Sequence, residues 1–439
     1  MLKRILIGFA GFVFLGVVLA AFFLFYDAPA PDTGSFVFSK TPDNEAYAAR
    51  IKVLNECFPK QAFEAFCNKH PSGRDLYTCA AEDWNHAAVA GLLAQAGQNG
   101  LWQALDDVLQ ASPPPPINDD HTLEVLPRIN LARLLEIKAR DEVLRGHPGE
   151  ALRTAFKSMA LGRKWAGAGG NINSWLGSLA VRATALRTVA GTIAARPLPD
   201  EALREALARV PASRPDARET AWVIRGETAW ALDLWSAAET GLRANWFTSF
   251  TYKPNLSKRR YLDRMTRMLS LAGCDEAALN ASGIDQGIED ERPTKWTKHN
   301  PYNQAGRLVL KMMQLSVASC FKRDMELHSM TSAIEALLAI QLYGSAHDRR
   351  PPPSLEALVP DFLPEVPRDG FDGSAIRYSV EERVVWFPGR FKATPPFVRG
   401  EDEKGDWNWA EYDNVFFLDP PPPAPAPSFS SAKTSTVPP

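Results

Sequence analysis

Cysteine and histidine are scarce in this chain, and neither forms a recognisable catalytic or metal-binding pattern. The 439 residues contain five cysteines and seven histidines, with no paired Cys-x-x-Cys, no His-Glu-x-x-His and no Gly-x-Ser-x-Gly. The histidines are scattered without metal-ligand spacing, among them His86, His121, His299 and His328. The sequence therefore gives no positive sign of a zinc hydrolase or a serine hydrolase.

An excess of charge of either sign is also missing. Lys and Arg together number 49 and Asp and Glu 51, which leaves a net charge of −2. Because nucleic-acid binding needs a basic surface that neutralises phosphates, this balance does not predict a nucleic-acid partner. A hydrophobic fraction of 45% supports sizeable cores, and the length allows two or three domains.

The longest uncharged stretch, residues 5–26, is the first feature that is present. As a helix it would be roughly 33 Å long, enough to cross a bilayer core. Lys3 and Arg4 precede it and acidic residues follow, so the positive-inside rule places the N-terminus in the cytoplasm and the remaining chain outside. A cleaved signal peptide is the alternative, but the apolar run is long for one, and Pro31 follows the small-residue candidate for cleavage.

Composition changes divide the chain into segments. We predict an anchor (1–27), a linker (28–41), a small cysteine-containing helical region (42–112), a Pro-rich linker (113–122), a helical hairpin domain (123–300), a long helix with a small α+β module (301–419) and a disordered Pro-rich tail (420–439). In the first helical region, helices are expected from Asp43 to Pro59, over 61–68 and over 85–111.

The five cysteines are candidates for disulfide bonds if they lie outside the cytoplasm, although their odd number leaves at least one thiol unpaired within the chain. They are Cys57, Cys67, Cys79, Cys274 and Cys320. A metal site formed by Cys57, Cys67, His70 and Cys79 is a weaker alternative. We expect no metal and no cofactor.

Residues 123–271 read as successive helices. A helix-period face ends at the turn His147-Pro148-Gly149, and 151–165 forms the returning helix of an antiparallel hairpin. Further helices are expected up to Ala195 and over 200–210, 216–243 and 256–271. In the helix over 216–243, Trp222, Trp230 and Trp235 are expected to form a packed stripe. Residues 274–300 read as a loop, and 304–343 as a long helix.

The most distinctive passage follows the long helix. Ser354 suits the N-cap of a short helical turn, Phe371-Asp372-Gly373 suits a tight turn, and two alternating runs around Glu381-Glu382 predict a β-hairpin. This passage resembles the globular part of the type II secretion major pseudopilin family, in which a long helix leads into a short helix and a small antiparallel sheet. The matching residues are Leu342-Tyr343, Pro353-Ser354-Leu355-Glu356-Ala357-Leu358-Val359, Leu363-Pro364, Pro367-Arg368-Asp369, Phe371-Asp372-Gly373 and Arg377-Tyr378. Many pseudopilins bind calcium in a closing loop; here the acidic stretch 400–406 is expected to be solvated instead.

The helical section together with this module also resembles a group of uncharacterised, membrane-anchored bacterial proteins common in planctomycetes and myxobacteria. The residues that carry this likeness are the Gly-rich turn before Asn171, Tyr252-Lys253-Pro254-Asn255, the 355–378 block and Asp413-Asn414-Val415-Phe416-Phe417-Leu418. This resemblance implies no particular activity.

The expected fold is therefore mainly α: an N-terminal transmembrane helix, a helical hairpin or bundle outside the membrane, and a small pseudopilin-like α+β module with a short antiparallel sheet. The expected location is the bacterial inner membrane, with a single pass and the bulk of the chain in the periplasm. The favoured function is a non-catalytic scaffold that binds other envelope proteins, secretion or pilus-like machinery included. The alternative is a periplasmic hydrolase whose site assembles from distant residues, and the sequence nominates no catalytic residue.

Overall fold

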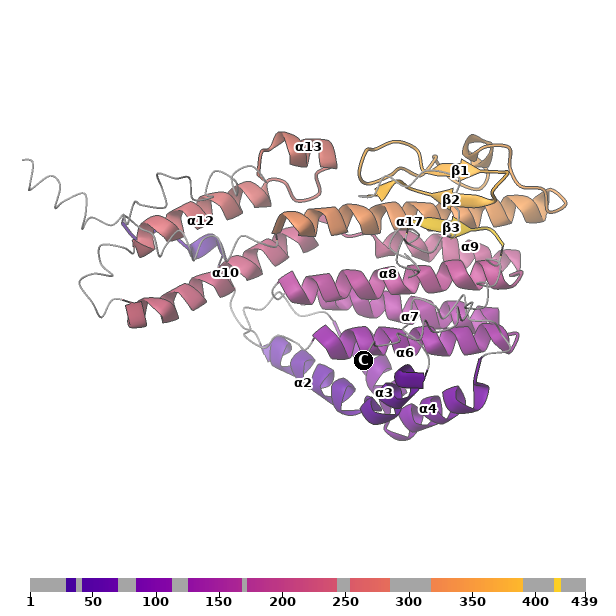
Figure 1. Cartoon of the computed structure of the whole chain (residues 1–439), viewed down its shortest axis with the longest axis horizontal. Helices are drawn as coiled ribbons and strands as arrows, with labels where there is room; N and C mark the ends of the chain where they lie inside the picture. The colour runs from indigo at the N-terminus through magenta and orange to yellow at the C-terminus, as the bar shows by residue number, and fades with distance from the viewer. Residues whose placement is uncertain are drawn as a thin grey trace, which may run out of the picture.

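The computed structural model describes residues 29–36, 42–69, 84–112, 125–167, 172–242, 253–284, 317–389 and 414–419. Within these ranges the protein is mainly α-helical, with a small three-stranded antiparallel sheet near the C-terminus (Figure 1). This confirms the mainly α class and the short sheet. The predicted anchor at 5–26, the acidic stretch 400–406 and the tail 420–439 lie outside the described residues. No helix within the described residues is long and apolar enough to cross a membrane.

Three long helices form the centre of the molecule. They are α6 (Val125–Leu144), α7 (Pro148–Gly167) and α8 (Ile172–Ala195). The α6–α7 turn contains His147 and Pro148, which confirms the predicted antiparallel hairpin. Helices α7 and α8 approach closely at Gly162, where an added Cβ would lie 2.7 Å from Cγ of Arg182.

The N-terminal helices cover one side of this layer (Figure 1). They are α2 (Pro42–Glu56), α3 (Lys60–Lys69), α4 (His86–Gln98) and α5 (Leu101–Gln110), preceded by the short 3₁₀ turn η1 (Gly34–Phe36). The single helix predicted over 85–111 is wrong, because Gly100 adopts a φ of 79° and separates α4 from α5. The apolar faces of these four helices pack against α6 and against Leu161, Trp165 and Val181 of the central layer.

Helix α17 (Val317–Ala346) lies on the opposite side of the central layer, packed on α8 and α9 (Figure 1). Every residue from 331 to 340 is buried, because the sheet and the loops before it cover the other face of this helix. The predicted long helix is confirmed for its described part; residues 301–316 lie outside the described ranges.

The remaining helices connect these layers or extend from one end. They are α9 (Asp200–Arg209), η3 (Val210–Ser213), α10 (Ala217–Leu242), α12 (Pro254–Leu269) and α13 (Glu276–Ala281). Helix α13 corrects the prediction that 274–300 begins with a loop: Asp275 caps it by accepting a hydrogen bond from the Ala278 N–H at 2.7 Å. The predicted tryptophan stripe is wrong for Trp230, which is 37% exposed, whereas Trp235 is fully buried.

The sheet has the order β1 (Arg377–Ser379), β2 (Val384–Trp386), β3 (Val415–Phe417), with all neighbours antiparallel. The β1–β2 hairpin confirms the prediction, with Tyr378 opposite Val385. Strand β3 is an addition that the sequence analysis did not predict. The short helix after Ser354 is the 3₁₀ turn η4 (Leu355–Leu358), and the Ser354 side chain does not cap it.

Candidate functional site

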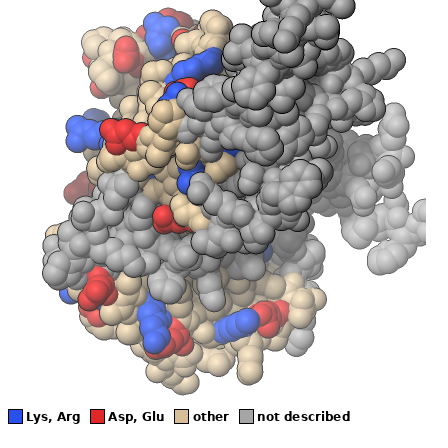
Figure 2. Space-filling view, turned by 90° about the vertical axis from the view of Figure 1, so that its left-hand side faces the viewer, with Lys and Arg blue, Asp and Glu red and all other residues tan. Residues whose placement is uncertain are grey.

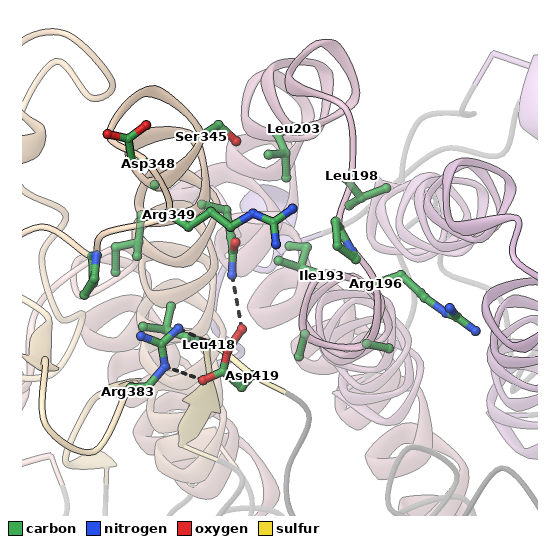
Figure 3. Close-up of a pocket in the computed structure, with 17 residues that line it drawn as sticks. Ile193, Arg196, Leu198, Leu203, Ser345, Asp348, Arg349, Arg383, Leu418 and Asp419 are labelled. Atoms are coloured by element: carbon green, nitrogen blue, oxygen red, sulfur yellow. Dashed lines mark hydrogen bonds and ion pairs between the residues drawn. The ribbon is translucent and has the colours of Figure 1, made fainter.

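A groove of about 730 Å³ lies where α8 and α17 both end, and strand β3 closes one side of it (Figure 3). Its apolar wall comes from α8, α9, α17 and the residue after β3, and includes Ile193, Leu198, Leu203, Ile340 and Leu418. Helix α8 ends here because Pro197 and Pro199 follow it and cannot continue a helix. The groove combines an apolar wall with charged side chains at its mouth.

Arg349 is the central cation of the groove. Figure 3 shows its side chain extending across the opening toward Ile193 and Leu198, whereas the side chain of Arg196 points away. Arg349 is exposed, and among the described residues no carboxylate forms an ion pair with it. It follows Asp348 in a left-handed turn, with φ values of 53° for Asp348 and 62° for Arg349. Left-handed backbone at a non-glycine residue costs about 1 kcal/mol or more, and such strain concentrates at functional sites.

The residues that close the groove are held by specific bonds. The Gln341 side-chain amide donates a hydrogen bond to the Leu418 carbonyl at 3.1 Å. Arg383 and Asp419 form a two-point ion pair, in which Nη2 donates to Oδ1 at 3.0 Å and Nε donates to Oδ2 (Figure 3). This pair raises the pKa of Arg383, so the guanidinium stays charged. The groove therefore contains two cations of different kinds. Arg383 is already paired with Asp419, whereas the guanidinium of Arg349 is available to bind a carboxylate from another molecule.

The lining of this groove offers groups that suit ligand binding. It is lined by arginines, two aspartates, Gln341 and Ser345, and by neither a histidine nor a cysteine. Arginines present fixed, charged donors that suit carboxylate or phosphate groups, and the apolar wall suits aliphatic side chains. The groove thus fits an extended segment that carries both apolar and acidic groups.

A second cavity of about 450 Å³ lies between α10, α17, the turn before α13 and the loop before β1. Asp324 and His328, one turn apart on α17, line it together with Cys274. Burial raises the pKa of Asp324 to about 7, opposed by a hydrogen bond that Thr220 donates at 2.6 Å. Burial and the nearby Arg214 lower the pKa of His328. Groups that titrate near neutral pH are suited to general acid–base chemistry.

A buried ion pair lies behind this cavity. Arg182 has a fully buried side chain, and its Nη2 lies 3.0 Å from Oε2 of Glu219. Burial raises the pKa of Glu219, although Arg182 acts in the opposite direction. The electrostatic effect of Arg182 also reaches Asp324. Two carboxyl groups thus share one buried cation, which favours protonation of one of them.

No activated nucleophile accompanies the acid–base pair in this cavity. Burial raises the pKa of the Cys274 thiol, and the neighbouring Asp275 raises it further, so the reactive thiolate is disfavoured. Asp369 is fully engaged: Ser329 donates to it at 2.6 Å, the Phe371 N–H at 3.0 Å and Arg377 at 2.9 Å. Asp369 therefore holds the loop before β1 in place.

The cysteines predicted as disulfide partners are only partly described. Cys57, Cys67 and Cys274 carry free thiols. Cys79 and His70 lie outside the described residues, as does the side chain of Cys320. Within the described ranges, no three histidine, cysteine, aspartate or glutamate side chains gather as a metal site would require. Disulfide formation by these cysteines and the alternative metal set remain predictions.

The residues of both cavities were not found from the sequence. Asp324 and His328 share the four-residue spacing of one helix face, but exposed helix faces show the same spacing. Arg349 stands in a run of Arg and Pro that reads as a polar turn. Comparison of the chain with known protein families, with curated proteins and with solved structures gives no match.

Proposed function

We propose that this protein is a membrane-anchored, non-catalytic scaffold of the bacterial cell envelope. In this proposal residues 5–26 anchor it in the inner membrane with the N-terminus in the cytoplasm, and the helical body lies in the periplasm, where it binds other envelope proteins. The groove with the free guanidinium of Arg349 carries the proposal, because it offers apolar and cationic contacts and its lining contains neither a histidine nor a cysteine. The likeness of residues 342–378 to the pseudopilin module supports a partner in secretion or pilus-like machinery.

The surface charge agrees with a protein partner. On the face shown in Figure 2, basic and acidic side chains of the described residues are interspersed. Recognition by such a surface depends on individual pairs and on a local groove, since no extended basic field is present on the described part of that face. We expect the partner to contribute an acidic side chain that reaches Arg349.

The test is crosslinking followed by affinity purification of the full-length protein from detergent-solubilised membranes. Arg349→Glu should remove a set of partners that the wild type retains, because it places a negative charge opposite the partner's acid. Arg218→Glu, on the exposed surface of α10 and outside the groove lining, is the matched control and should retain them. Identical partner sets for Arg349→Glu and the wild type would refute the groove as the binding site.

The anchor needs a separate measurement. Cell fractionation should find the full chain in the inner membrane, and removal of residues 1–28 should release it into the soluble fraction. Protease added to spheroplasts should digest the helical body while leaving cytoplasmic markers intact. Protection of the helical body would reverse the proposed orientation.

A periplasmic hydrolase is the second candidate, favoured by Asp324 and His328 in the smaller cavity. Burial raises the pKa of Asp324 to about 7 and lowers the pKa of His328, and water would have to act as the nucleophile because Cys274 holds its proton. Turnover of an ester, phosphate or peptide panel that disappears in both Asp324→Asn and His328→Gln would support this function. Absence of turnover by the folded wild type across the panel would leave the scaffold proposal in place.

A further inference from the structure

Three side chains that can donate hydrogen bonds are buried near one end of the central helices, and their donor atoms have no acceptor. Arg128 of α6 is 1% exposed, Trp165 of α7 is 1% exposed and Tyr47 of α2 is 4% exposed. All three nitrogens of the Arg128 guanidinium, the Trp165 indole nitrogen and the Tyr47 hydroxyl lack a hydrogen-bond partner. We call these three residues the donor cluster.

Arg128 lies close to each of the other two side chains. The Arg128 guanidinium carbon lies 4.8 Å from the centre of the Trp165 ring. Burial raises the pKa of Tyr47 to about 12, and the neighbouring Arg128 charge acts against that rise. Burial lowers the pKa of Arg128 to about 10, so the guanidinium is still charged at neutral pH. A full positive charge therefore sits inside this part of the core.

Stacking on Trp165 alone accounts poorly for this arrangement. A cation–π contact offsets only part of the free-energy cost of burying an uncompensated charge. Arg182, which is also fully buried, has a carboxylate beside it: its Nη2 lies 3.0 Å from Oε2 of Glu219, although Nε and Nη2 of Arg182 lack a hydrogen-bond partner as the Arg128 nitrogens do. Buried polar groups without partners are rare in native proteins, and a cluster of them calls for a bound acceptor.

Two further cations lie on the helices that carry the donor cluster. Lys164 of α7 donates to the Ala111 carbonyl, and Arg50 of α2 donates to the Asp107 carbonyl at 3.2 Å. Both bonds cap the end of α5. They use carbonyl oxygens, so neither bond neutralises the cation. Burial lowers the pKa of Lys164, and the charge of Arg50 lowers it further.

We propose that Arg128, Tyr47 and Trp165 bind a single oxyanion, a carboxylate or a phosphate group, between α2, α6 and α7. An oxyanion has several acceptor lone pairs on one small group, so it can receive the guanidinium, hydroxyl and indole donors together. It also neutralises the buried charge. A free anion and an acidic group carried by a partner share this chemistry, and phosphate or acetate in solution represents both.

The test uses thermal unfolding of the full-length protein with sodium phosphate or sodium acetate added against sodium chloride at constant ionic strength. If the oxyanion is free in solution, the wild type should show a saturable rise in Tm, because a ligand that binds only the folded state stabilises it. Arg128→Met, which keeps the apolar stem over Trp165, should weaken phosphate binding about tenfold or more. Arg182→Met is the matched control: it also removes a buried arginine, but should keep the wild-type affinity.

Tyr47→Phe tests the same site independently, in case Arg128→Met does not fold. It deletes only a hydroxyl without a partner, so the variant should be at least as stable as the wild type without anion and should bind phosphate several-fold more weakly. The proposal is overturned if the wild type responds to neither anion, or if Arg128→Met responds as the wild type does.

Discussion

Asp324 is a single carboxyl group whose surroundings oppose its ionisation. Its pKa rises from an ordinary value of 3.8 to about 7 because the group is buried. The folded protein therefore holds the proton more tightly than the unfolded chain does at pH values between these two limits. By linkage, this group makes the protein progressively less stable as the pH rises from about 4 to 7.

Asp324→Asn should remove that pH dependence. The amide oxygen still accepts the hydrogen bond from Thr220, and the side chain no longer ionises. At about pH 3, where Asp324 is protonated in both the folded and the unfolded chain, the two proteins should unfold at similar temperatures; at pH 8 the variant should have the higher Tm. Glu219 also has a raised pKa and is unchanged, so some of the slope will remain. Parallel Tm profiles for the two proteins from pH 5 to 8 would contradict the assigned pKa.

Asp141 is the opposite case, because its buried carboxylate has both hydrogen-bond and charge partners. It accepts hydrogen bonds from Trp84 Nε1 at 3.2 Å and His86 Nδ1 at 2.7 Å, and it forms an ion pair with Arg145 at 2.7 Å. It thus ties α4 to α6. Asp141→Ala leaves these donors unpaired and should lower the free energy of unfolding by about 3 kcal/mol in urea titrations. The control Glu150→Ala, at an exposed pair, should cost less than about 1 kcal/mol, and equal losses would argue against the role of Asp141.

At the scale of the element, the sequence predicts helices and turns well where one local signal dominates. The α6–α7 hairpin follows from a 3.6-residue apolar period interrupted by His147-Pro148-Gly149, and the β1–β2 hairpin follows from alternation around Glu381-Glu382. Strand β3 is separated from β2 by a long stretch of chain and pairs only through tertiary contact, so no local signal marks it. The cavities escape prediction for the same reason, since Asp324, Cys274 and Arg349 meet their neighbours only after the helices pack.

The break between α4 and α5 depends on a single residue. Gly100 has a φ of 79°, a conformation that costs other residues about 1 kcal/mol or more, whereas Gly91 lies inside α4 with open space around it. Gly100→Ala should therefore lower the free energy of unfolding by about 1 kcal/mol, and Gly91→Ala should raise it by about 0.5–1 kcal/mol. Urea denaturation of the two variants checks both signs. A stabilising Gly100→Ala would mean that α4 and α5 can join into the continuous helix that the sequence suggests.

For the whole molecule, the main structural consequence is that the C-terminal sheet shares its core with the helices. One cluster of buried side chains runs from Leu186 and Ile193 of α8, through α17, to Val385 and Phe416 of the sheet. Helix α17 is buried on both faces because the central layer covers one and the sheet covers the other. Removing residues 353–418 would expose an apolar face of α17, so point variants such as Arg349→Glu are the appropriate test of the groove.

This shared core predicts that sheet and helices unfold together. Phe416, 5% exposed, belongs to the shared core, whereas the adjacent Phe417 is half-buried on the other face of the sheet. Phe416→Ala should lower the free energy of unfolding by about 3–5 kcal/mol, and Phe417→Ala by less, because only the first opens a cavity in the core. Hydrogen exchange should then show faster opening of α8 and α17 in Phe416→Ala by the same factor as in the sheet, since global unfolding exposes all of them at once. Faster exchange confined to β1, β2 and β3 would show instead that the sheet is a separately folding cap on a helical body that is stable without it.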